Sequence, residues 1–118
     1  MSRRGKKIGK WGEQQACYFL CRHGFKVVDR NYHTTVGEID IIAIKGGDYY
    51  FVEVKTRQKG RLDDNTAITW HKQKKLQKTV LHYCYHKNIR DSALILAGLM
   101  VVVDKVKKKL NFSLFILF

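Results

Sequence analysis

The sequence predicts one α/β domain with about five strands and two helices. Three stretches carry this prediction: an apolar stripe at helical spacing before Gly24, two β-rich runs joined at Gly46-Gly47, and a nearly unbroken apolar run at Leu94–Val103. A chain of 118 residues suits one sizeable core, and neither a proline nor a long polar linker divides it. We therefore expect a single domain over residues 1–118, with residues 1–8 as a flexible basic arm.

Each element follows from a local signal. The first helix is expected over about Lys10–His23. Its apolar residues, such as Ala16 and Leu20, repeat at helical spacing, and Gly24 is a good stop signal. The remaining expected elements are a strand at Phe25–Tyr32, hairpin strands at Gly37–Ile44 and Tyr49–Arg57, a polar loop at Gln58–Asp64, a second helix at about Thr66–His86, and strands at Leu94–Val103 and Leu110–Phe118.

The glycine pair Gly46-Gly47 predicts a hairpin with a two-residue loop, and such a loop fixes the register of both strands. Lys45 then pairs with Asp48. Because side chains alternate along a strand, one face of this hairpin becomes a core layer. That layer consists of the pairs Ala43–Tyr50, Ile41–Val52 and Ile39–Val54.

The other face of the hairpin sets acidic residues across from each other. Asp40 lies opposite Glu53, and Glu38 lies opposite Lys55. Directly opposite Cβ atoms are only ~4.5–5.5 Å apart, so two facing carboxylates destabilise a hairpin unless a cation binds between them. Oxygen ligands alone suit Mg²⁺ or Mn²⁺ better than zinc. The alternative is a solvated strand face on which Glu38 and Lys55 form an ordinary cross-strand pair.

Two charged residues depart from the polar and apolar division of the expected helices. Glu13 is in register with the apolar stripe of the first helix, so its carboxylate either pairs with a Lys or Arg or points into the metal site. Lys72 lies near Leu76 on the helical wheel, so it either reaches the site and holds a phosphate or extends past the core to solvent. The pattern leaves both alternatives open.

The net charge indicates the class of partner. Lys and Arg number 23 and Asp and Glu number 10, which gives a formal charge of +13 and a sequence pI near 9.9. Such a chain is attracted to polyanions, with nucleic acid, DNA above all, as the first candidate and an anionic membrane surface as the second. No apolar run reaches the ~20 residues of a transmembrane helix. No signal peptide is evident before Trp11, so we expect a cytoplasmic protein with no membrane partner.

Several motifs together resemble the YraN family of uncharacterised bacterial proteins (uncharacterised protein family 0102). Asp40 followed by Glu53-Val54-Lys55 is similar to the pattern of the PD-(D/E)XK nuclease superfamily, to which archaeal Holliday-junction resolvases belong. The resemblance covers the first half of the chain closely and the second half loosely. It implies a restriction-endonuclease-like three-layer core, in which a mixed sheet lies between two helices. The matching motifs are Gly9-x-x-Gly12-Glu13-x-x-Ala16-x-x-x-Leu20-x-x-x-Gly24, Arg30-Asn31-Tyr32, Gly37-Glu38-Ile39-Asp40 and Phe51-Val52-Glu53-Val54-Lys55-Thr56-Arg57.

The same resemblance implies roles for particular residues. Asp40, Glu53 and the Val54 carbonyl would hold Mg²⁺ or Mn²⁺, and Glu13 would complete the site. Lys55 would position the attacking water or stabilise the transition state. The expected catalytic residues are therefore Asp40, Glu53, Lys55 and Glu13.

The resulting expectation is a metal-dependent endonuclease that acts on DNA, including branched or structured DNA. Two alternatives stay open: a non-catalytic nucleic-acid-binding module with the same fold, and an RNA nuclease. Intact acids favour catalysis, because a pure binder gains nothing from carboxylates beside phosphates. The apolar end Phe115–Phe118 is either buried in the domain or forms a homodimer interface. Contacts with nucleic acid are expected from Lys72, Arg57, Lys59, Arg61 and Arg30.

Overall fold

The computed structural model describes residues 3–60 and 70–117, with side chains at residues 9–60 and 72–117. It has the predicted α/β fold, with a five-stranded mixed sheet and two helices. Part of the expected Gln58–Asp64 loop and the start of the expected second helix lie outside the described residues. The elements in chain order are α1 (Arg3–Arg22), β1 (Lys26–His33), β2 (Glu38–Lys45), β3 (Asp48–Gln58), α2 (Trp70–Lys87), β4 (Leu94–Asp104) and β5 (Lys109–Ile116).

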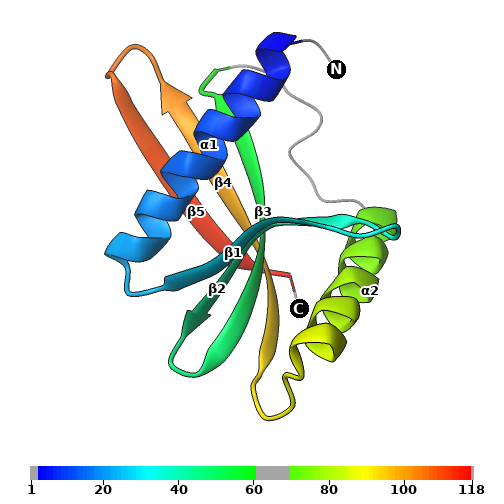
Figure 1. Cartoon of the computed structure of the whole chain (residues 1–118). Coiled ribbons are helices and arrows are strands. Elements are labelled where there is room, and N and C mark those ends of the chain that lie inside the picture. The colour runs from blue at the N-terminus through cyan, green and yellow to red at the C-terminus, as the bar shows by residue number, and fades with distance from the viewer. Residues whose placement is uncertain (1–2, 61–69, 118) are drawn as a thin grey trace.

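The strands follow one another across the sheet in the order β1-β2-β3-β4-β5. Neighbouring strands are antiparallel except β3 and β4, which are parallel. A parallel pair needs a crossover connection, and α2 lies in the connection between β3 and β4. Figure 1 shows α1 lying across the sheet and α2 standing beside it, so that the helices form the outer two of three layers.

Two apolar cores lie on opposite faces of the sheet. Toward α1, Ile41 and Val52 pack with Ala16 and Leu20 of that helix. Toward α2, the alternate strand positions pack against the buried helix residues Leu76, Val80, Tyr83 and Cys84. The hairpin face opposite the predicted core layer is also covered, because Ile42 and Phe51 continue the apolar surface on the α2 side. A strand covered on both faces alternates little in polarity.

The first helix is longer than predicted at its start and ends where predicted. It begins at Arg3 rather than near Lys10, so residues 3–8, expected as a flexible arm, form its first turns. Lys and Arg are good helix formers, and no proline interrupts the run. At the other end Gly24 adopts a left-handed φ of 85°. The Phe25 N–H donates to the Leu20 carbonyl at 3.0 Å, and the Gly24 N–H donates to the Cys21 carbonyl at 3.2 Å, which closes the helix with a Schellman motif.

The hairpin turn forms as predicted. Gly46 and Gly47 have φ values of 60° and 81°, the left-handed backbone that a two-residue type I′ turn requires. Lys45 pairs with Asp48, and the register holds up to Ile41 and Val52. A short glycine turn therefore fixes the alignment of most of the hairpin.

The C-terminal strand β5 lies at one edge of the sheet. Phe112 and Leu114 pack against the core on the α1 side, whereas Ile116 is 59% exposed. The apolar end is thus partly buried in the fold and partly open to solvent. In the parts of the chain that the structure describes, neither helix has the length and apolar character needed to cross a bilayer.

Candidate active site

The candidate site lies where β2 and β3 separate. Their ladder ends at the pair Ile41 and Val52. Beyond this pair the Val54 main-chain N–H donates a hydrogen bond of 2.8 Å to Asp40 Oδ2. A side-chain carboxylate, rather than a carbonyl of the facing strand, therefore accepts this bond. The predicted pair of Asp40 with Glu53 is absent from the ladder. We call the region beyond Ile41 and Val52, where the two strands no longer pair, the β2–β3 fork.

The packing of Ile39 explains the fork. In a regular strand Ile39 and Ile41 would point to the same face. Instead, Ile39 is buried in the core toward α2, and Ile41 is buried in the core toward α1. β2 also stays paired with β1 at this point, through Tyr32 and Ile39. The alternation of β2 is thus broken around Asp40, and the predicted pair of Ile39 with Val54 is absent from the ladder.

The predicted cross-strand pair of Glu38 with Lys55 is wrong. Glu38 Oε2 lies 3.0 Å from Nδ1 of His33 on β1, and both side chains are mostly exposed. Because β2 pairs with β1 and not with β3 at this end, Glu38 is directed to the β1 side. It is therefore a neighbour of the site and not a partner of Lys55.

Glu53 is the most enclosed charged group of the site. Its side chain is 7% exposed, and its Oε1 atom lies 2.6 Å from Lys72 Nζ and 3.9 Å from Lys55 Nζ. Lys55 is two residues further along β3, so it projects from the same face of the sheet. Lys72 comes from α2 and reaches the site instead of extending past the core. The carboxylate of Glu53 therefore already has a cationic neighbour.

Asp40 is the carboxyl group whose protonation is most altered. Burial, the largest cause, and the nearby charge of Glu53 together raise the pKa of Asp40 to about 8. The Val54 N–H opposes this effect, because it donates to the charged form. Near neutral pH the fork thus keeps a proton on a carboxyl group that is ionised in water.

Glu13 reaches the fork from α1. A Cβ atom on Gly12 would collide with the side chain of Thr56, so glycine at this position lets α1 lie directly against β3. Burial raises the pKa of Glu13, while the charge of Arg30 and a hydrogen-bonding interaction with Asp40 lower it. Glu13 therefore has a basic neighbour in Arg30 and also lies beside the acids of the fork.

The two lysines of the site have opposite pKa changes. Burial lowers the pKa of Lys55, and the neighbouring ammonium of Lys72 lowers it further. For Lys72, burial is the largest single influence and acts in the same downward direction. The hydrogen bonds to Glu53 and Lys55 and the charges of Glu53 and Asp40 together outweigh burial and raise the pKa of Lys72. Lys72 thus holds its proton firmly, whereas Lys55 loses its proton more readily than a lysine in water.

The remaining expected nucleic-acid contacts are spread around this group. Arg30 on β1 donates from its guanidinium to Gln14 Oε1 at 2.8 Å, which places it beside α1 and Glu13. Arg57 follows Lys55 on the same face of β3. Lys59 is bonded instead to Asp104 at the end of β4, at 3.5 Å. Arg61 lies outside the described residues.

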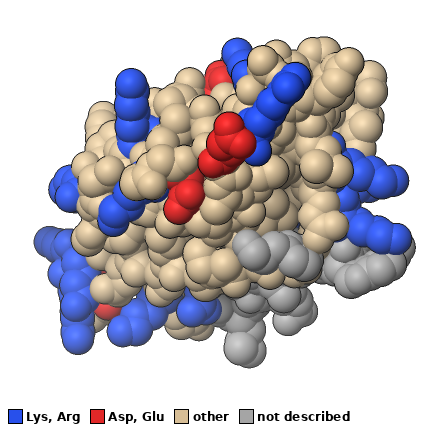
Figure 2. Space-filling view, turned by 90° about the horizontal axis from the view of Figure 1, so that it is seen from below, with Lys and Arg blue, Asp and Glu red and all other residues tan. Residues whose placement is uncertain are grey.

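The surface charge is predominantly basic with a local exception. Figure 2, which views the molecule from below, shows acidic side chains gathered near the middle of that face, with Lys and Arg side chains distributed around them and along the rim. On this face, basic side chains therefore surround a small acidic group.

The donor atoms of the fork suit a hard divalent cation. Asp40 and Glu53 offer carboxylate oxygens, and Val54, the residue after Glu53, offers a main-chain carbonyl. These are the donor types that Mg²⁺ and Mn²⁺ bind. Among the side chains that the structure describes, no three His, Cys, Asp or Glu residues are already arranged as a full metal site. Lys72 occupies the Oε1 atom of Glu53, so a cation bound at this atom would have to displace the ammonium.

Gln14 was not among the residues expected to take part in the site. It holds the guanidinium of Arg30 beside the site from the position after Glu13. A polar residue next to an inward carboxylate is a weak signal, since most such residues face solvent. Its partner on β1 depends on how α1 crosses the sheet, which helix periodicity does not specify.

Together, the fold and the fork define a small α/β protein with a partly buried group of acids and lysines where two strands separate. The model of the uncharacterised protein family UPF0102 matches residues 12–108. A UPF0102 protein of Alkaliphilus oremlandii is 37% identical over 105 residues, which cover 88% of this chain and 90% of the relative. Another, from Dictyoglomus turgidum, is 36% identical over 111 residues and 92% of each chain. The chain belongs to the UPF0102 family, as the YraN-like motifs predict.

Proposed function

We propose that this chain is a metal-dependent endonuclease of the PD-(D/E)XK type, which hydrolyses phosphodiester bonds of DNA at the β2–β3 fork. One observation carries the proposal: Glu13, Asp40, Glu53 and Lys55 converge from α1, β2 and β3 on a single place. Grouped acids destabilise a fold, because the charge of each raises the pKa of its neighbour. Such groups are typical of functional sites. A cation bound between the acids would offset their repulsion and could contact a phosphate.

In this proposal Asp40, Glu53 and the Val54 carbonyl hold Mg²⁺ or Mn²⁺, and Glu13 completes the acidic group. The bound cation would polarise the phosphate and make its own water a stronger acid. Because the pKa of Asp40 is raised to about 8, Asp40 has to release a proton before it can act as a ligand. Metal binding near neutral pH is therefore accompanied by proton release.

The lysines divide the remaining tasks. Lys55 has a lowered pKa, so its amine can accept a proton from the attacking water, and its ammonium can stabilise charge on the phosphate. Lys72 stays protonated and can bind either Glu53 or a phosphate oxygen. Arg30 lies on the other flank, where it is placed to contact the nucleic-acid backbone.

A second candidate is supported by a specific contact. The 2.6 Å ion pair between Lys72 and Glu53 neutralises one of the acids without any metal. A protein that uses this fork only as a structural ion pair would be a nucleic-acid-binding module with the same fold. The two candidates differ in one measurable respect, since only the nuclease requires a divalent cation for an effect on DNA.

The test is cleavage of a panel of branched, flapped, single-stranded and duplex DNA and RNA substrates with Mg²⁺, Mn²⁺ or EDTA. The variants Asp40→Asn, Glu53→Gln and Lys55→Ala should each lose cleavage by about 10²–10⁴-fold and bind DNA as tightly as the unaltered chain or more tightly. Glu38→Gln is the matched control, because it removes a nearby charge that lies outside the site. Cleavage in EDTA, or full cleavage by Asp40→Asn, would overturn the proposal.

A further inference from the structure

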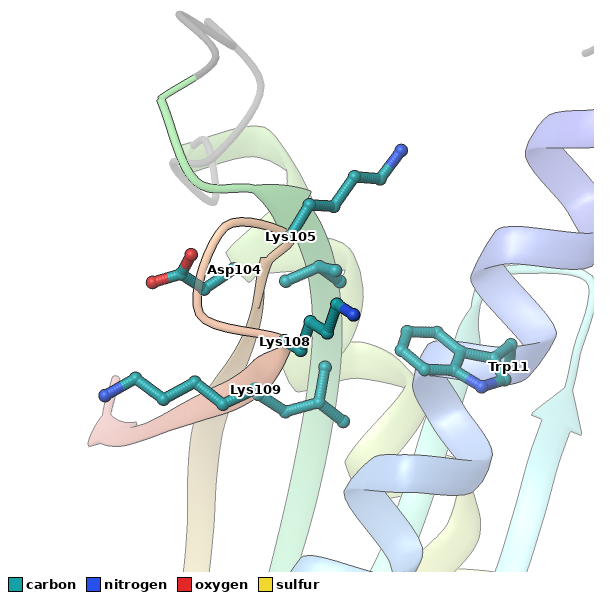
Figure 3. A pocket seen from close by; sticks show the side chains of 7 residues that line it. Trp11, Asp104, Lys105, Lys108 and Lys109 are labelled. Atoms are coloured by element: carbon teal, nitrogen blue, oxygen red, sulfur yellow. The ribbon is translucent and has the colours of Figure 1, made fainter.

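A hollow of about 310 Å³ lies between α1 and the turn that joins β4 to β5. Figure 3 shows Trp11 projecting from α1 toward this turn. The hollow lies on the flank of α1 away from Glu13, because residues two apart on a helix point about 200° apart. Its lining consists of Trp11, Val103, Asp104, Lys105, Lys108, Lys109 and Leu110.

The hollow combines an aromatic surface with positive charge. Trp11 is 41% exposed, although a large aromatic side chain normally gains from burial. Lys105 and Lys108 lie on the side of the turn that faces the indole, whereas the ammonium of Lys109 is directed away from it (Figure 3). Within the described residues, neither Lys105 nor Lys108 forms an ion pair with an acidic side chain.

The one acid beside the hollow is occupied elsewhere. Asp104 is buried, and its carboxylate accepts hydrogen bonds from the Lys107 main-chain N–H at 3.0 Å and from Lys59 Nζ at 3.5 Å. These contacts hold the turn in place and lower the pKa of Asp104. In Figure 3 the carboxylate points away from Trp11, so it does not neutralise the lysines that face the indole.

Lys108 also has an unusual backbone. Its φ is 51°, in the left-handed region that glycine and asparagine adopt more easily than lysine. A glycine would fit this backbone with less strain but would remove an ammonium from the rim of the hollow. The turn therefore has a lysine at a position where backbone energetics alone favour glycine.

We infer that this hollow binds an unpaired nucleotide of a nucleic-acid strand, with the base stacked on Trp11 and the adjoining phosphates held by Lys105 and Lys108. Aromatic stacking accepts any base, and ammonium groups bind phosphate without regard to sequence. The inference deepens the proposed function and rests on it for the choice of a nucleic acid. The hollow and the fork lie on different sides of α1. Because a helix is about 10–12 Å across, only a few nucleotide steps separate the two. The substrate class is then a duplex that continues into a single strand.

The first experiment measures binding without cleavage, in EDTA. Trp70→Phe leaves Trp11 as the sole tryptophan of the chain, because the sequence contains two. Titration with an oligodeoxythymidylate of about eight nucleotides should quench the Trp11 fluorescence, and a blunt duplex of equal length should quench it far less. Binding of the oligonucleotide, shown by its anisotropy, with no change in Trp11 fluorescence would overturn the inference.

Variants separate stacking from charge. Trp11→Leu should weaken oligodeoxythymidylate binding by about tenfold or more, whereas Tyr85→Ala, which removes an aromatic side chain that is 84% exposed on α2, should leave it unchanged. Equal effects of these two variants would contradict a site at Trp11. Circular dichroism melting checks that Trp11→Leu is folded.

Lys108→Gly is the second variant, and glycine fits the left-handed backbone at this position. It should reduce the slope of log affinity against log salt by about 0.7, the value for one phosphate contact on a single strand. Lys26→Ala, at the opposite end of the sheet, is its charge-matched control and should affect this slope less. An unchanged slope in Lys108→Gly would contradict the role of Lys108. If the unaltered chain cleaves no substrate of the panel but oligodeoxythymidylate still quenches Trp11, the result would support the subsite and refute the proposed chemistry.

Discussion

At its turn end, the β2–β3 hairpin is paired in regular register from Lys45 and Asp48 to Ile41 and Val52, and its side chains fill two apolar cores. At its other end the strands separate, and the carboxyl groups of Asp40 and Glu53 lie close together with little exposure to solvent. The two ends are only a few residues apart on the same strands. They differ in their effect on stability: the apolar side chains of the paired end stabilise the folded state, whereas the carboxyl groups at the other end destabilise it.

This difference shows how a small fold can hold an unfavourable group of charges. Buried apolar area contributes roughly 25 cal/mol per Å² to stability, so the paired end stabilises the hairpin. Grouped acids act in the opposite direction, as the raised pKa of Asp40 shows. The fork is therefore maintained by its surroundings: Gly12 allows α1 to pack on β3, and Ile39 anchors β2 in the core toward α2.

The largest effect on stability is expected at the paired end. Ile41→Ala removes a fully buried side chain, so it should lower the free energy of unfolding by about 2–5 kcal/mol. Urea denaturation in EDTA measures this change. Asp40→Ala, one residue away, is the comparison and should be neutral or stabilising in EDTA near neutral pH, because it removes a carboxyl group that has to take up a proton when the chain folds. Similar losses in both variants would remove the proposed contrast between the two ends.

A pH-dependent effect follows from Asp40. Its pKa is about 8 in the folded chain and near 3.8 when unfolded, so its contribution to stability is fully present below about pH 4 and is lost as the pH rises toward 8. The ideal slope is about 1.4 kcal/mol per pH unit. Unfolding measured from pH 4 to 9 in EDTA should show this fall in the unaltered chain and a smaller one in Asp40→Asn. Parallel curves would contradict the raised pKa.

A smaller effect is expected from Lys72. Its side chain is 41% exposed, so solvent weakens the ion pair with Glu53, and Lys72→Met should cost about 1 kcal/mol of stability or less in EDTA. The same change should enlarge the stabilisation by Mn²⁺, because no ammonium then competes for Glu53. Lys78→Met, on an exposed part of α2, is the control. A smaller Mn²⁺ effect in Lys72→Met would show that Lys72 supports metal binding.

The paired end could be predicted from the sequence because its causes are local. Two adjacent glycines set the turn, and the turn sets the register up to Ile41 and Val52. The end of α1 at Gly24 is local in the same sense. Such features depend on residues that are close together in the chain.

The fork could not be predicted in detail, because its causes are distant in the chain. The register alone placed Glu38 opposite Lys55, but pairing with β1 draws Glu38 to His33. The carboxylate of Asp40 accepts a hydrogen bond from the Val54 N–H at the point where the β2–β3 ladder has ended. The acids themselves were candidates from their spacing and from the family resemblance. Whether Lys72 reaches the site or extends past the core was left open, and its contact with Glu53 was not predicted.

The most direct test of the acidic group as a metal site is thermal melting of the unaltered chain and Asp40→Asn, in EDTA and with Mn²⁺. A metal that binds only the folded state at a hundred times its Kd stabilises it by about 2.7 kcal/mol. Asp40→Asn should therefore melt at a higher temperature than the unaltered chain in EDTA and gain less from Mn²⁺. A lower melting temperature for Asp40→Asn in EDTA, together with an unchanged Mn²⁺ shift, would show that Asp40 is an ordinary structural carboxylate.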